Sequence, residues 1–303
     1  MKIVVLGGGA STERDVSLRS ASAVAKALRQ AGFIADELDP KDGLQAMDNL
    51  PKNTIVFPVL HGQNGEDGSI QAELEKRNLP YLGTDSQASA NCYNKWKTRQ
   101  ILVAAKVPVA NGELVTERTY RNSELAKRPH VLKVTEGGSS IGTYLVRDPS
   151  RVEQSKVDEV FSLHGEAVVE ELVEGTEITV PVLDNRALPV IEIRPPEAGE
   201  FDYENKYNGA SEEICPPVSI DEKQQKIAQE LAVRVHKTMG CRHLSRTDII
   251  VRPDGSMAVL EINTIPGMTD QSLFPLAAKV AGTSMVELVK QFVKMVERDY
   301  KLS

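Results

Sequence analysis

Hydrophobic residues in the first third of the chain follow the pattern of alternating strands and helices. Residues 3–6 form an uninterrupted apolar run that leads into a glycine cluster, and from about Val16 apolar residues recur at helical spacing until Gly32. The other elements expected here are strands at 33–38 and 54–60 and a short helix at 69–77. Alternation of this kind predicts a parallel sheet with helices on both faces.

Two loops of this predicted sheet carry residues able to bind an amino acid. Loops 7–13 and 61–68 follow the carboxyl ends of parallel strands, where ligands bind in such folds, so the two loops should converge. They contain Glu13 and His61, which could fix the ammonium and carboxylate groups of an amino acid. The alternative is structural: a loop histidine is more often a hydrogen-bonding residue, and Glu13 could be an ordinary first-turn acid of a helix.

The rest of the chain has a different, largely antiparallel pattern. The expected strands are 131–134, 143–146, 167–173, 176–183, 188–193, 246–251 and 257–263, and the expected helices are 86–107, 151–163, 221–239 and 284–298. Residues 195–217 lack periodicity and contain many prolines, glycines and acids. A loop of this length within a compact domain is usually a lid or a disordered insert.

Length and composition narrow the class of protein. A chain of 303 residues with 41% hydrophobic and 26% charged residues suits a globular protein of two or three domains that share a cleft. A net charge of −7 argues against nucleic acid as a partner, but it does not exclude nucleotides. Three widely spaced cysteines predict neither a metal pair nor a disulfide framework, and the N-terminal apolar run is too short for a signal peptide or membrane span. We therefore expect a cytoplasmic protein without membrane segments.

The last predicted hairpin carries the strongest cluster of candidate site residues. Asp248 lies on one strand, and Glu261 and Asn263 are two apart on the other, so period-two geometry sends the latter two to one face. If the strands pair, three oxygen-bearing side chains converge, which suits Mg²⁺. Arg246 shares this face and could stabilise developing oxyanion charge. The alternative is a salt-bridged surface hairpin, although the surrounding apolar residues disfavour it.

Three further segments could contact a nucleotide or its phosphates. A Pro-Gly turn follows the hairpin, and its backbone N–H groups could form part of an oxyanion hole, although most such pairs are merely turns. Glycines and hydroxyls at 136–142 could surround phosphate oxygens, with Lys133 as a point charge, or the segment could be an ordinary hairpin. The linker at 170–177 could offer backbone groups to an adenine edge and Glu177 to a ribose, but it is equally a plain acidic turn.

Taken together, these segments resemble the D-alanine–D-alanine ligases of the ATP-grasp superfamily. The resemblance runs in family order from residue 4 to about 275, and its most specific motifs are His-Gly…Gly-Glu-Asp-Gly at 61–68 and Glu-Ile-Asn-Thr-Ile-Pro-Gly-Met-Thr at 261–269. It implies an ATP-grasp fold of α/β class with α+β elements in three domains. These are an N-terminal parallel α/β domain (1–86) with the first D-alanine site, a central domain (87–172), and a C-terminal domain (173–303) with the metal site and a lid at about 195–217. The last two domains would enclose ATP.

The resemblance also implies a role for each matching residue. The ATP-binding set would be Lys95, Lys133, Glu170, Val173 through its backbone, Glu177 and Lys206. Two Mg²⁺ ions, with Mn²⁺ as a possible substitute, would be held by Asp248, Glu261 and Asn263. The catalytic and substrate-binding set would be Glu13, His61 and Ser139 for the first D-alanine, Arg246 and Gly267 for the oxyanion, Ser272 and Leu273 for the second carboxylate, and Lys206 and Tyr207 on the lid.

The implied reaction joins two D-alanines through an acyl phosphate, for peptidoglycan precursor synthesis, in a homodimer. The rival interpretations are another ATP-grasp carboxylate–amine ligase, a D-alanine–D-lactate ligase and an inactive nucleotide-binding protein. Glu13, His61 and the Lys206-Tyr207 segment disfavour the first, Tyr207 disfavours the second, and retention of the metal and oxyanion residues disfavours the third. One departure from the family pattern is Asn94, where an aspartate often precedes the lysine that matches Lys95.

Overall fold

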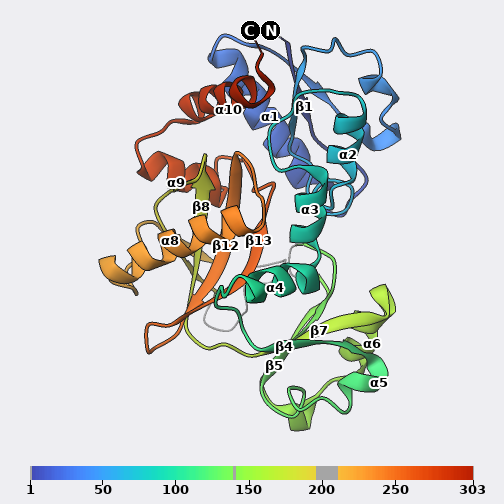
Figure 1. The fold of residues 1–303 in the computed structure, drawn as a ribbon, viewed down its shortest axis with the longest axis vertical. Helices are drawn as coiled ribbons and strands as arrows, with labels where there is room; N and C mark the ends of the chain where they lie inside the picture. Colours follow the sequence, from blue (N-terminus) through green and yellow to red (C-terminus); the bar gives the residue numbers. More distant parts are fainter. Residues whose placement is uncertain (1, 139–140, 196–210, 303) are drawn as a thin grey trace.

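The computed structural model describes residues 2–138, 141–195 and 211–302, whose strands form three sheets (Figure 1). The first sheet has the order β2-β1-β3 and both of its pairings are parallel, as the alternating pattern predicts. Its elements are β1 (Lys2–Leu6), α1 (Arg14–Gln30), β2 (Ile34–Leu38), β3 (Ile55–Pro58) and α2 (Ser69–Lys76), with short 3₁₀ turns at Pro40–Asp42 and Gln45–Met47. The three strands and two helices begin and end within about three residues of their expected positions, whereas the two 3₁₀ turns were not predicted.

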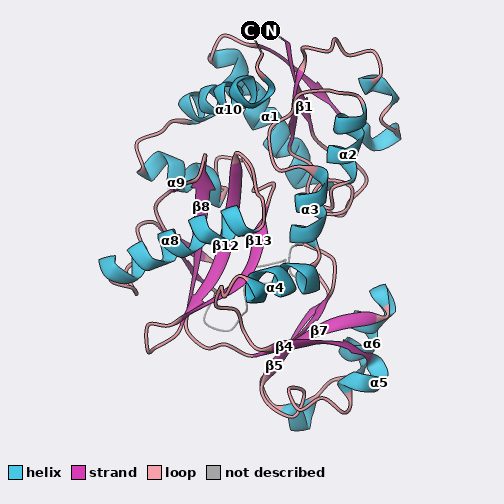
Figure 2. Cartoon of the chain, viewed as in Figure 1, coloured by secondary structure: helices cyan, strands magenta, loops and turns pink. Residues whose placement is uncertain are grey.

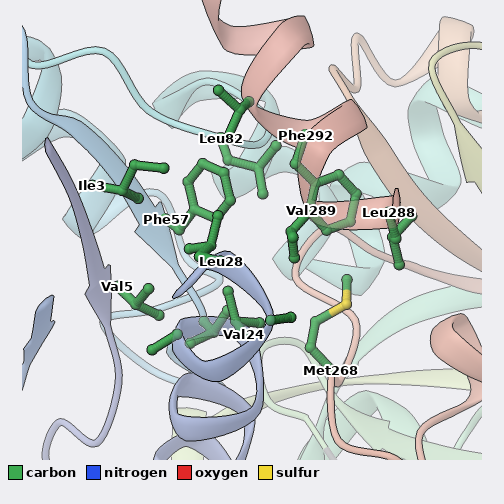
Figure 3. Packing of buried hydrophobic residues seen from close by; sticks show 14 of the residues in the cluster. Ile3, Val5, Val24, Leu28, Phe57, Leu82, Met268, Leu288, Val289 and Phe292 are labelled. Carbon is green, nitrogen blue, oxygen red and sulfur yellow. The ribbon is translucent and has the colours of Figure 1, made fainter. Parts of the chain in front are cut away.

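The last helix, α10 (Met285–Tyr300), packs against this first sheet although it is far away in sequence (Figure 3). Phe292 meets Phe57 of β3 edge to face, with ring centroids 6.2 Å apart. Met268 also lies in this core, so the turn that contains Gly267 is anchored to the first sheet. The packing brings the two ends of the chain close together (Figure 1).

The expected helix at 86–107 is wrong as a single element. The structure has two helices, α3 (Ser86–Tyr93) and α4 (Lys95–Ala104), which meet at Asn94. Asn94 adopts an extended backbone conformation, and its side-chain oxygen accepts a hydrogen bond of 2.9 Å from Lys97 N. An asparagine in this role begins a new helix, because it satisfies a backbone donor that the preceding turn would leave unpaired.

The second sheet is antiparallel, with the order β4-β7-β5-β6. Its elements are β4 (Gly112–Thr116), α5 (Glu117–Tyr120), β5 (His130–Val134), β6 (Thr143–Val146), a 3₁₀ turn at Pro149–Arg151, α6 (Gln154–His164) and β7 (Glu166–Glu171). A compact core between α6 and the sheet includes Leu132, Val157 and Val169. The sequence pattern predicted this antiparallel region and its crossing helix but missed β4 and α5.

The third sheet has the order β11-β10-β8-β12-β13, with β9 paired to β8, and it is antiparallel throughout. Its strands are β8 (Thr176–Leu183), β9 (Arg186–Ala187), β10 (Ile191–Arg194), β11 (Glu212–Ile214), β12 (Leu244–Val251) and β13 (Met257–Asn263); its helices are α8 (Glu222–Thr238) and α9 (Leu273–Val280). Figure 2 shows α8 lying across these strands. Strand β11 falls in the stretch expected to lack structure, because its Glu-Glu-Ile sequence shows no alternation of its own.

Two observations bear on the expectations from composition. All three cysteines are free, although Cys92 Sγ lies 3.8 Å from Cys241 Sγ. Within the described ranges, no helix combines the length and apolarity needed to cross a bilayer.

Candidate active site

A cavity of about 610 Å³ lies where the loops of the first sheet, helices α3 and α4, and the β12–β13 hairpin meet. Its walls contain nine of the residues that the sequence singled out: Glu13, His61, Lys95, Arg246, Glu261, Asn263, Gly267, Ser272 and Leu273. These residues come from segments up to 260 positions apart in the sequence, from Glu13 to Leu273. The fold therefore collects the candidate amino-acid and phosphate residues around one space.

The β12–β13 hairpin pairs as its sequence pattern predicts. Asp248 lies directly opposite Glu261, and Arg246 lies directly opposite Asn263. Because residues paired across strands share a face, all four side chains lie on one side of the sheet. A bulge follows the Asp248–Glu261 pair and leaves Leu260 as the extra residue of β13.

Electrostatic pairing stabilises the buried acid of this cluster. Arg246 donates two hydrogen bonds to Asp248, Nε to Oδ1 at 3.0 Å and Nη2 to Oδ2 at 2.9 Å, and Thr179 Oγ1 also donates to Oδ1. Such a bidentate pair offsets the cost of removing the Asp248 carboxylate from water. The same guanidinium lies at the cavity wall, where it can interact with negative charge on a ligand.

The oxygens of this cluster fit a hard divalent cation. Asn263 Oδ1 accepts a hydrogen bond from Ile265 N at 2.8 Å, which fixes the amide and leaves one lone pair of that oxygen for another partner. With the carboxylates of Asp248 and Glu261, it makes a set of two acids and one amide, the ligand type that Mg²⁺ prefers. Among the described residues no group of three His, Cys, Asp or Glu side chains is placed to bind a metal, so the amide is needed for this set.

Two lysines lie beside the hairpin and the 136–142 loop. Lys95 Nζ donates to Gly137 O at 2.6 Å, and Lys133 Nζ forms an ion pair of 2.8 Å with Glu170. Burial is the main cause that lowers the pKa of Lys95; Lys133 adds to this effect and Glu261 opposes it. Burial also acts to lower the pKa of Lys133, but the carboxylates of Glu170, Glu261 and Glu177 together more than offset it, so that pKa is raised. Two ammonium groups so close together attract an anionic ligand such as a phosphate chain.

The two N-terminal loops converge, as their positions at strand ends predict. Ser11 Oγ donates to His61 O at 2.8 Å and joins one loop to the other. The Glu13 carboxylate approaches two glycines so closely that a Cβ would lie 2.8 Å from Oε2 at Gly62 and 3.1 Å from it at Gly138. Glu13 is therefore enclosed by both N-terminal loops and by the 136–142 loop.

A hydrogen-bonded chain connects His61 to the turn after β13. Ser20 Oγ of α1 lies 3.4 Å from His61 Nε2 and accepts a hydrogen bond of 3.3 Å from Met268 N. The residue next to Met268 is Gly267, where a Cβ would lie only 2.7 Å from Ser272 Oγ. Ser272 begins α9, and its hydroxyl accepts from Thr269 N at 3.0 Å. A side chain at position 267 would therefore displace the Ser272 hydroxyl from its place at the start of α9.

The remaining predicted residues either do not line the cavity or lie outside the described ranges. Val173 lies in the linker between β7 and β8, and Glu177 lies on β8 close enough to Lys133 to raise its pKa. Ser139, Lys206 and Tyr207 lie outside the described residues.

The sequence analysis missed several residues that line or support the site. Glu66 accepts a hydrogen bond of 3.2 Å from Gly62 N and lines the cavity, and its position in the 61–68 motif could have indicated this. Ser20 falls within the helical pattern of α1, and nothing in the sequence around it indicated a role at the site. Glu213 lines the cavity from β11, a strand that the sequence did not predict.

Comparison with known proteins identifies the family. Family models described as D-ala D-ala ligase N-terminus and C-terminus match residues 34–84 and 96–294. A D-alanine–D-alanine ligase of Xanthobacter autotrophicus is 40% identical over 299 residues, covering 96% of this chain and 97% of the relative.

Solved structures agree with these sequence matches. The Bacillus anthracis D-alanine–D-alanine ligase superposes with a TM-score of 0.86 at 29% identity, covering 99% of each chain. The same ligase complexed with ATP gives 0.84 at 26% identity, again covering 99% of each chain. The expected ATP-grasp fold is therefore confirmed, and the chain belongs to the family of D-alanine–D-alanine ligases.

Proposed function

We propose that this chain is an ATP-dependent ligase that joins two D-alanines into D-alanyl-D-alanine and releases ADP and phosphate. The observation that carries the proposal is the single cavity at which Glu13 and His61, Lys95 beside the 136–142 loop, and the Arg246–Glu261–Asn263 face meet. An amino-acid site, a cationic phosphate site and an oxyanion site would then be adjacent. This is the arrangement that a carboxylate needs in order to be activated by phosphate and then attacked by an amine.

In the first step, a D-alanine carboxylate oxygen attacks the γ-phosphorus of ATP, and ADP leaves to give an acyl phosphate. Glu13, enclosed by three loops, would hold the ammonium of this D-alanine, with His61 and Ser139 beside it. Lys95, Lys133 and Lys206 would neutralise the phosphates, while Glu170, Val173 and Glu177 would hold the adenosine. Positioning and charge neutralisation supply most of the acceleration in such transfers.

In the second step, the ammonium of another D-alanine releases one proton to water and its amine nitrogen attacks the acyl carbon; the second proton lost from this nitrogen leaves with the phosphate. The carbonyl oxygen becomes an oxyanion, and phosphate leaves as the carbonyl reforms. Arg246 and the Gly267 N–H would stabilise that oxyanion, and Ser272 with the Leu273 N–H would bind the second carboxylate. Lys206 and Tyr207 would close over the site and keep water from the acyl phosphate.

Asp248, Glu261 and Asn263 would hold two Mg²⁺ ions, or Mn²⁺, which neutralise phosphate charge when bound. The Arg246–Asp248 ion pair of 2.9 Å holds these two side chains together on their face of the sheet. In a metal site of this kind, the role of the protein is to hold the ligand oxygens in position.

The remaining proposals concern the whole protein. The three sheets support a division into domains at 1–86, 87–172 and 173–303, with α10 packed back onto the first. The family resemblance supports a role in peptidoglycan precursor synthesis, a cytoplasmic location and a homodimer.

An ADP-release assay tests the function directly. We expect D-alanine alone to support ADP release with formation of the dipeptide, and L-alanine or D-lactate alone to give none. Activity that required a different carboxylic acid would overturn the D-alanine assignment, and a depsipeptide formed from D-alanine and D-lactate would identify the hydroxyl acid as the acceptor.

A further inference from the structure

Glu213 has a position in the cavity that the proposed roles leave unused. It lies on β11 and is half-buried, whereas its neighbour Glu212 is exposed and lies 3.6 Å from Arg194. Glu213 lines the cavity, and Glu212 does not. The two acids therefore point to opposite sides of the strand, as period-two geometry requires.

The register of the third sheet places Glu213 on the same face as the oxyanion and cation residues. Glu213 pairs with Ile193 of β10, Ile193 pairs with Glu177 of β8, and Glu177 pairs with Ile250 of β12. Ile250 shares its face with Asp248 and Arg246, because they alternate along β12. The pairing of these four strands thus places one more carboxylate on the face that carries the proposed chemistry.

The surroundings of Glu213 belong to the side of the cavity assigned to the second amino acid. Its partner Ile193 packs with Leu273 in a small apolar cluster, and Leu273 lines the cavity at the start of α9. Ser211, two residues earlier in the chain, also lines the cavity, and its buried hydroxyl has no hydrogen-bond partner in the described structure. This edge therefore presents both a carboxylate and a hydroxyl to a ligand.

The environment of the Glu213 carboxylate suits the binding of a positively charged group. Burial raises the pKa of its carboxyl, and the nearby Arg246 guanidinium acts to lower it. Asp248 already balances the charge of this guanidinium. The Glu213 carboxylate therefore gives an ammonium group that approaches the oxyanion site a partner of opposite charge.

We propose that Glu213 binds the ammonium group of the second amino acid and so determines that the acceptor is an amine. This inference rests on the proposed ligase function, in which Ser272 and Leu273 bind the carboxylate of the same molecule. Glu213 acts by binding and orientation, and it selects an α-amino acid over an acceptor that carries no positive charge.

Steady-state kinetics with D-alanine as donor and acceptor test the assignment, because the rate curve yields one KM for each subsite. Glu213→Gln keeps the shape of the side chain and removes its charge. We expect the KM of the second subsite to rise about tenfold, the effect of losing one charged hydrogen bond, while the KM values for the first D-alanine and ATP stay within about twofold. Glu213→Asp, which keeps the charge, should recover most of the affinity.

Glu212→Gln is the matched control, since it removes the adjacent charge on the outer side of the same strand. It should leave all three KM values unchanged. A second-subsite KM within twofold of the unchanged enzyme in Glu213→Gln, or an equal rise of all three values, would overturn the assignment. The proposed function fails separately, if the unchanged enzyme shows no ADP release with D-alanine.

Discussion

The two sides of the cavity are positioned by different kinds of structure. On one side, Arg246, Glu261 and Asn263 are fixed by strand pairing within a six-stranded sheet. On the other, Glu13 and His61 lie in loops that are held by individual hydrogen bonds, such as Ser11 Oγ to His61 O. The pairing of two strands can shift only by whole residues, and such a shift moves every side chain of the strand. The hydrogen bonds that hold a loop can instead be lost one at a time. We therefore expect substitutions on the sheet side to abolish chemistry and substitutions on the loop side to change affinity gradually.

Loss of charge at Glu261 should have the largest effect. Glu261→Gln removes a negative charge from the proposed cation ligands without changing the side-chain shape. We expect D-alanine-dependent ADP release to fall by about 10³-fold or more, with an unchanged melting temperature. Asp254→Asn in the turn of the same hairpin removes an exposed charge far from the cavity and serves as the control. Turnover close to that of the unchanged enzyme in Glu261→Gln would refute the metal assignment.

The stability of the folded chain should depend on pH through the buried side chain of His243, which contacts Gly83 and Asp299. His243, just before β12, accepts a hydrogen bond of 2.9 Å from Gly83 N and donates one of 2.9 Å to Asp299 of α10. Burial is the main cause that lowers its pKa from 6.5 to about 4, with Arg242 and Arg298 adding to it and Asp299 opposing it. Between pH 4 and 6.5 the unfolded chain therefore binds more protons at His243 than the folded chain does. The contribution of His243 to the free energy of unfolding is fully present above about pH 6.5 and is lost as the pH falls toward 4.

For His243 the loss amounts to about 3 kcal/mol of unfolding free energy at full protonation. Urea unfolding at a series of pH values measures it. His236 is buried with its pKa also lowered to about 4, and burial lowers the pKa of His130 as well, so His243→Asn should remove only the part of the slope of stability against pH that His243 contributes. Asparagine suits the left-handed backbone at this position, where φ is 66°. An unchanged slope in the variant would contradict the assignment.

The smallest effect should come from Asn94, which positions a loop through a single hydrogen bond. Its Nδ2 donates to Glu136 Oε1 at 2.9 Å, and this contact holds the start of the 136–142 loop next to Lys95. Asn94→Asp keeps the acceptor that caps α4 but places a carboxylate against Glu136. We expect the KM for ATP to rise about fivefold, as befits an exposed contact, with kcat nearly unchanged.

Combining Asn94→Asp with Glu136→Gln should restore the ATP affinity, because the new amide can donate to the new carboxylate. Glu136→Gln alone is the control for the loss of charge. If the double variant were no better than Asn94→Asp, the contact would not position the loop.

The same contrast explains what the sequence could predict. The hairpin face was predictable because period-two spacing fixes Glu261 and Asn263 locally, and only the pairing with Asp248 had to be assumed. The break at Asn94 was missed because the apolar spacing continues across it. Strand β11 owes its structure to pairing with β10, so nothing in its own residues indicated the strand or placed Glu213 in the cavity. The packing of α10 on the first sheet likewise depends on contacts between distant segments.

The prediction that the substrate is D-alanine rests on the family resemblance at Glu13, His61 and Tyr207 rather than on physical reasoning. These side chains could bind many different amino acids, and only the family motif indicates that the substrate is D-alanine. The structure describes the positions of Glu13 and His61, so their proposed roles can now be tested one by one.

Transfer of oxygen from substrate to phosphate tests the central claim most directly. If the D-alanine carboxylate attacks the γ-phosphorus of ATP, then D-alanine labelled with oxygen-18 in its carboxylate must pass one labelled oxygen to the released phosphate at each turnover. Mass spectrometry of the phosphate and of the dipeptide measures this transfer. We predict one labelled oxygen in each phosphate formed with the dipeptide. Dipeptide formation with unlabelled phosphate would contradict the acyl-phosphate mechanism.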